Sequence, residues 1–196
     1  MELMIATMVF GVVLLFITMA ILQFTRVYYK GLNQANTQDT TRTIIDNISQ
    51  AIQFNGGNVT TTPPRNYGST ASFCVGNQQY TYVIGKQMVE SAPTGSQTFH
   101  SLVSRDLAGC SSSSTMPPMN SAYTTGRELL TPKMRLAKME VSSVGSNLYR
   151  VTVKVVYGDD DLLQDPTAAD TKCKSQAGSQ FCAVSEITTV VTKRVE

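Results

Sequence analysis

The hydrophobic residues of this chain follow two patterns, an unbroken apolar run near the N-terminus and alternating apolar and polar positions in the second half. Residues 3–22 contain no charge, no proline and one glycine, Gly11. Twenty residues of α-helix rise about 30 Å, which matches the hydrocarbon thickness of a bilayer. The run therefore predicts a membrane-spanning helix, with the acid Glu2 directly before it and the bases Arg26 and Lys30 soon after it.

The helical pattern continues beyond the apolar run. Isoleucines recur at helical spacing, at Ile44, Ile45, Ile48 and Ile52. Residues 33–42, NQANTQDTTR, are polar on every side, so we expect the helix to be weak or locally frayed there. The glycine pair that follows Asn55 is a strong stop signal. The sequence thus predicts one helix from the N-terminus to about Phe54, roughly 75 to 80 Å long.

After Gly57 the pattern changes to period two, which is typical of β-strands. Strands are predicted at residues 71–75, 79–84, 97–103, 135–144, 148–157 and 181–195. In the segment 148–157, alternate residues from Tyr149 to Tyr157 are apolar and share one face of the strand. Arg150, Thr152 and Lys154 lie on the opposite face, which predicts a half-buried antiparallel strand. The predicted fold class is α+β. A long N-terminal helix (residues 1–54) packs against an antiparallel β-sheet head domain (residues 55–196).

Composition and cysteines narrow the compartment. The net charge is +2, only 15% of residues are charged, and the bases are scattered, which argues against nucleic acid as a partner. The four cysteines, Cys74, Cys110, Cys173 and Cys182, allow three pairings, of which nearest neighbours are the simplest. A zinc site is disfavoured because there is no CxxC motif and His100 is the only histidine. Disulfides indicate an extracytoplasmic head.

The charged residues next to the apolar run predict the opposite location for the head. Arg26 and Lys30 follow the apolar run, so the positive-inside rule alone would leave the head in the cytosol. The run is too long for a cleavable signal peptide and has neither a basic segment before it nor an A-x-A site after it. We therefore expect a membrane anchor whose basic leader preceded Met1 and has been removed.

The order of a long helix and then a sheet, with an acid at the head of the apolar run, resembles the type IV pilin superfamily of pilus subunits and type II secretion pseudopilins. The residues that carry the resemblance are the ELMIA segment at positions 2–6 and Gly11. In that family a basic leader is cleaved after a glycine, the new N-terminal residue is methylated, and a glutamate follows. The resemblance implies that Glu2 is this glutamate, that it meets the N-terminal amine of a neighbouring subunit, and that Gly11 is the helix glycine. Residues 12–22 lack the proline that many pilins carry there.

The resemblance implies a structural subunit that polymerises through its N-terminal helix into a pilus-like filament, with adhesion, motility or DNA uptake downstream. The implied partners are further copies of the chain, other pilin subunits and the inner-membrane assembly machinery. The helix would sit in the inner membrane before assembly. Two alternatives stay open, a type II secretion pseudopilin and a monomeric membrane-anchored binding module. No cofactor is expected.

Each candidate residue also has a simpler interpretation. Glu2 could be a carboxylate at the membrane edge, and Gly11 could be a neutral glycine of a membrane helix. The acids Asp159, Asp160, Asp161 and Asp165 could ligate calcium, but they lack an EF-hand pattern, so a solvated loop is favoured. His100 stands in no nucleophile motif, so we do not expect an enzyme.

Overall fold

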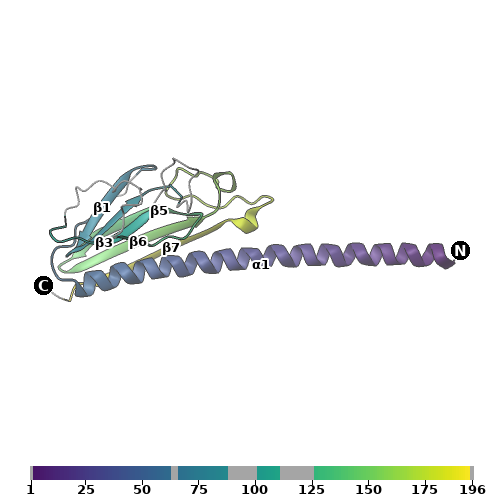
Figure 1. The fold of residues 1–196 in the computed structure, drawn as a ribbon, viewed down its shortest axis with the longest axis horizontal. Helices are drawn as coiled ribbons and strands as arrows, with labels where there is room; N and C mark the ends of the chain where they lie inside the picture. Colours follow the sequence, from purple (N-terminus) through teal and green to yellow (C-terminus); the bar gives the residue numbers. More distant parts are fainter. Residues whose placement is uncertain (1, 63–65, 88–100, 111–125, 195–196) are drawn as a thin grey trace.

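The structure is a computed structural model of the chain, and it describes residues 2–62, 66–87, 101–110 and 126–194. Helix α1 (Glu2–Phe54) is a single element of 53 residues. The head lies along its C-terminal part, while its N-terminal part projects away from the head (Figure 1). The helix ends where the sequence predicts, because Gly56 and Gly57 adopt positive φ angles of 47° and 82°.

The head contains two antiparallel sheets, so the predicted α+β fold is confirmed. The first sheet has the strand order β1 (Thr70–Val75), β2 (Gln78–Val83), β3 (Leu102–Asp106) and β4 (Gly126–Glu128). The second has the order β5 (Met134–Gly145), β6 (Leu148–Tyr157) and β7 (Ala183–Thr192). Two short 3-10 turns, η1 (Asp160–Leu162) and η2 (Ser179–Phe181), lie between β6 and β7.

Backbone hydrogen bonds join the two sheets along β5. Gly85 N donates to Leu136 O at 2.8 Å, and Thr62 N donates to Val141 O at 2.9 Å. Residues from both sheets share one hydrophobic core with α1, which includes the fully buried Ile44 and Ile48 of the helix and Phe73 of β1. The second half of α1 is therefore part of the core of the head.

The polar stretch of α1 is regular helix, so the prediction of a weak or frayed segment is wrong. Thr37 and Thr41 are fully buried against the head. Their Oγ1 atoms donate to the carbonyls of Asn33 and Thr37, each at 2.7 Å, so both of these buried hydroxyls have a partner. Their methyl groups can then pack like those of valine. A sequence pattern that classes threonine as polar does not reveal this.

Strand β6 is buried on both faces, contrary to the half-buried prediction. Thr152 and Lys154, on the face predicted to be exposed, are each only 5% exposed. The physical reason is that β6 is the central strand of its sheet, so side chains from β5 and β7 flank both residues. Lys154 Nζ lies 3.7 Å from a carboxylate oxygen of Glu186, and the hydroxyls of Thr152 and Thr188 are 3.0 Å apart.

The strand boundaries agree closely in β1, β2, β5 and β6 and less well elsewhere. The strand predicted at 97–103 begins only at Leu102 and runs to Asp106, and residues 97–100 lie outside the described part of the chain. Strand β4 has three residues, too few for a period-two pattern, and was not predicted. Strand β7 is Ala183–Thr192, shorter at both ends than predicted.

The cysteines form two disulfides, Cys74–Cys110 and Cys173–Cys182. This is the nearest-neighbour pairing among the three that the sequence allows. The first bridge joins β1 to the segment after β3. The second closes the loop that precedes β7 and contains η2.

Candidate functional site

The exposed N-terminal half of α1 is the most unusual surface of the molecule. Every side chain from Leu3 to Leu32 is exposed, including three phenylalanines, of which Phe24 is 74% exposed. This half is long and apolar enough to cross a membrane. A soluble monomer rarely exposes so large a continuous apolar surface, so it requires cover from lipid or from another chain.

Glu2 is the first residue of α1 and directly precedes the apolar surface. Gly11 lies nine residues further along, where a Cβ atom would meet no other atom within 4 Å. No contact within the described part of the chain therefore requires a glycine at position 11.

Gly11 shares one helix face with three threonines. Thr7, Gly11, Thr18 and Thr25 follow one another at spacings of four and seven residues, which keeps them within a narrow arc. Thr7 Oγ1 donates to Met4 O at 3.0 Å, and the hydroxyls of Thr18 and Thr25 donate to the carbonyls four residues earlier, each at 2.8 Å. The side chains on this face are small, and each of the three threonine hydroxyls has an acceptor within the helix. Small residues and threonine are the types that let membrane helices approach closely.

Two amides of the polar stretch fasten the exposed half to the head. Asn33 Nδ2 donates to Gln180 O at 2.9 Å, and Gln34 Nε2 donates to Val184 O at 3.2 Å. The rings of Tyr29 and Phe181 lie 6.0 Å apart, centroid to centroid. Sequence reasoning missed Asn33 and Gln34, because an amide at the edge of a polar run carries no signal of its distant partner.

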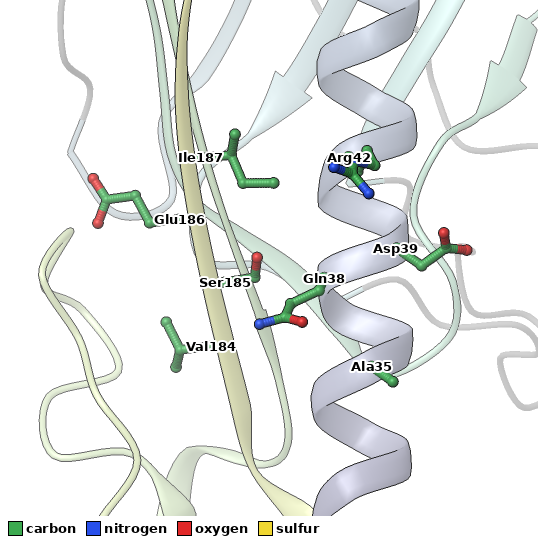
Figure 2. A pocket seen from close by; sticks show the side chains of 8 residues that line it. All are labelled: Ala35, Gln38, Asp39, Arg42, Val184, Ser185, Glu186 and Ile187. Atoms are coloured by element: carbon green, nitrogen blue, oxygen red, sulfur yellow. The ribbon is translucent and has the colours of Figure 1, made fainter.

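A groove lies between α1 and β7 and has a volume of about 720 Å³. Figure 2 shows Gln38 pointing from the helix toward Ser185, and Asp39 and Arg42 also line the groove. It is open and holds no arrangement of nucleophile, base and orienting group. Within the described residues no cluster of three or more His, Cys, Asp or Glu could hold a metal ion.

The acidic segment after β6 is held by contacts within the protein. Asp160 forms an ion pair with the buried Arg135, whose guanidinium also donates to Gly158 O at 2.9 Å. Thr167 donates hydrogen bonds to Asp165 from its side chain and from its backbone. These bonds lower the pKa of Asp165 below its usual value, and the side-chain bond contributes most. Asp160 and Asp165 therefore stabilise the conformation of the loop. His100 lies outside the described residues.

The fold and this surface define a class of molecule: an α+β head carried on a helix whose exposed half can span a membrane. No family model, no characterised protein and no solved structure matches the chain. The function must therefore be argued from the residues themselves.

Proposed function

We propose that the chain is a structural subunit of a type IV pilus-like filament and polymerises through the N-terminal half of α1. One observation carries the proposal: a continuous apolar helix surface, from Leu3 to Leu22, is covered by no other part of the described chain. The amides of Asn33 and Gln34 bond α1 to the head just beyond that surface. A rigid subunit of this shape suits regular stacking.

The same surface fits two environments in turn. A helix of this length and composition is stable in lipid, and it is equally stable in a bundle of like helices, where van der Waals packing replaces contact with acyl chains. Repeated contacts between different faces of identical subunits do not close on themselves and generate a helical filament. The membrane would therefore hold the subunit until it joins the filament.

Glu2 is the residue proposed to set the axial register between subunits. A carboxylate in an apolar environment costs a few kcal/mol on insertion scales, so it requires a cationic partner. The N-terminal amine of a neighbouring subunit would neutralise the charge, and the pair would fix how far one helix is displaced along the next.

The test is a Glu2→Ala variant, expressed in the native host and measured by shearing and pelleting filaments. We expect normal insertion into the membrane and a severalfold loss of sheared filament. The matched control is Asp46→Ala, which removes the same charge from an exposed position of α1 outside the apolar run and should leave the yield unchanged. A Glu2→Ala filament yield equal to that of the wild type would contradict the proposal and favour a monomeric membrane-anchored module.

A further inference from the structure

The Cys173–Cys182 loop lies beside α1 just beyond the apolar run. In Figure 1 the yellow segment before β7 reaches further along α1 toward its N-terminus than the rest of the head. A hollow of about 400 Å³ separates the two elements, lined by Arg26 and Lys30 of the helix and by Gln176, Ser179 and Gln180 of the loop. Two segments distant in the sequence thus form one surface.

When α1 spans a bilayer, Arg26 is at the height of the lipid headgroups and Lys30 is just outside them. Arg26 and Lys30 lie about 6 and 12 Å along the helix from Leu22, at 1.5 Å per residue. The headgroup layer adds about 5 to 7 Å to each side of the hydrocarbon core. The loop that faces these two residues is therefore the part of the head nearest to the membrane.

The two bases point toward the head. Arg26 and Lys30 precede Asn33, Thr37 and Thr41 at spacings of three and four residues, so they continue the helix line that packs against the head. Both are exposed, and among the described residues neither forms an ion pair. Their charges are available to an anionic partner in the hollow.

The chemistry of the loop fits a lipid interface. Residues 175–181, SQAGSQF, contain no acid, and Phe181 is 47% exposed where it contacts Tyr29, which is 45% exposed. Tyrosines and exposed aromatic residues beside bases are typical of the membrane interface. Of the nearby acids, Asp160 pairs with Arg135, and Lys174 Nζ donates to the backbone carbonyl oxygen of Asp161 at 2.7 Å, which brings a positive charge beside this acidic turn.

The uncharged run also favours a tilted helix. It extends from Leu3 to Thr25, about 34 Å, which exceeds the hydrocarbon thickness and is accommodated by tilting. Interfacial aromatic residues and bases set the direction of such a tilt. A tilt toward the line of Arg26 and Lys30 lowers the Cys173–Cys182 loop onto the bilayer.

We propose that this surface docks on phospholipid headgroups, so that the head of the inserted subunit leans on the membrane before assembly. Arg26 and Lys30 donate hydrogen bonds to lipid phosphate oxygens within the hollow, and Tyr29 and Phe181 lie at the boundary with the acyl chains. The proposal rests on the membrane anchoring that belongs to the proposed function, but not on filament formation.

The chain contains no tryptophan, so the fluorescence of a single introduced tryptophan reports only the surroundings of that residue. Ala177→Trp places the probe on the exposed tip of the loop, and Ser146→Trp places a matched probe on the exposed turn at the other end of β6. The full chain is reconstituted at low density in phosphatidylcholine/phosphatidylglycerol vesicles whose acyl chains are brominated near the headgroup. We expect the tryptophan at position 177 to lose a large part of its fluorescence and the one at 146 to lose none.

A charge variant then tests the role of the bases. Adding Arg26→Gln and Lys30→Gln to the Ala177→Trp chain should weaken the quenching, whereas Lys193→Gln and Arg194→Gln, at the far end of the head, should not. Equal quenching of the two tryptophans by the brominated lipid, in chains that float with the vesicles, would overturn the docking. Quenching unchanged by the loss of Arg26 and Lys30 would overturn their contact with phosphate. Chains that fail to float would refute the membrane anchoring itself, and the docking with it.

Discussion

Tyr80 is the side chain that ties the first sheet to the helix. It is fully buried, stacks on Phe73 with ring centroids 4.9 Å apart, and its hydroxyl donates to Asn47 Oδ1 at 2.8 Å. Removing that hydroxyl leaves the amide oxygen without its donor. We expect Tyr80→Phe to lower the free energy of unfolding by about 1 to 2 kcal/mol, measured by denaturant titration of the full chain in detergent. A change below the experimental error would show that solvent reaches Asn47.

Burial raises the pKa of Tyr80 well above its usual value, with a smaller contribution from the charge of Asp106. A phenol of raised pKa in the folded state stabilises the protein fully below the unfolded pKa of about 10, and this contribution is lost as the pH rises further. The stability of the wild type should therefore fall above about pH 10. The Tyr80→Phe protein should show a smaller fall over the same range.

A substitution at Gly11 can distinguish the effect of contacts within the chain from the effect of contacts between chains. Because a Cβ atom at Gly11 meets nothing within 4 Å, Gly11→Leu should leave insertion and head stability unchanged. If neighbouring helices approach along the face that contains Thr7 and Thr18, the added side chain should reduce filament yield severalfold. Gly31→Leu is the control, since Gly31 is equally open and lies on nearly the opposite helix face.

At the scale of elements, α1 has two halves with opposite roles. Ile48 is fully buried in the shared core, whereas Ile17 is half exposed on the apolar surface. We expect Ile48→Ala to lower the free energy of unfolding by about 2 to 5 kcal/mol, through lost transfer energy and the cavity left behind. The same change at Ile17 should have no effect on the head. Equal effects at both positions would contradict the separation of roles, and calorimetry of the detergent-solubilised chain can measure it.

The elements that were predicted well are those whose pattern is local. The isoleucine repeat and the glycine pair fixed the end of α1, and regular alternation located β6. What failed depends on neighbours distant in the chain. Lys154 looked exposed because nothing near it in the sequence shows that β6 is flanked on both sides. Thr37 and Thr41 looked polar because their hydroxyls are satisfied by their own helix.

The whole molecule is a long helix with a head on one end, and this shape was predictable from the sequence because it follows from one apolar run and one change of period. The candidate site was predictable only in part. Glu2 and Gly11 stood out in a background of apolar residues, whereas the contact between Asn33 and Gln180 spans 147 residues and has no local signal.

The connection between the two ends of the chain has a consequence for how the protein is made. Gln34 contacts Val184, 150 residues later, and Arg194 N donates to Gln53 O at 3.3 Å. The helix precedes β7 by about 130 residues, so the core around Ile44 and Ile48 is not complete until β7 has emerged. Contacts of such sequence separation form late and slowly. A chain interrupted before β7 would carry α1 without a closed head, so folding of the head is complete only when β7 is in place.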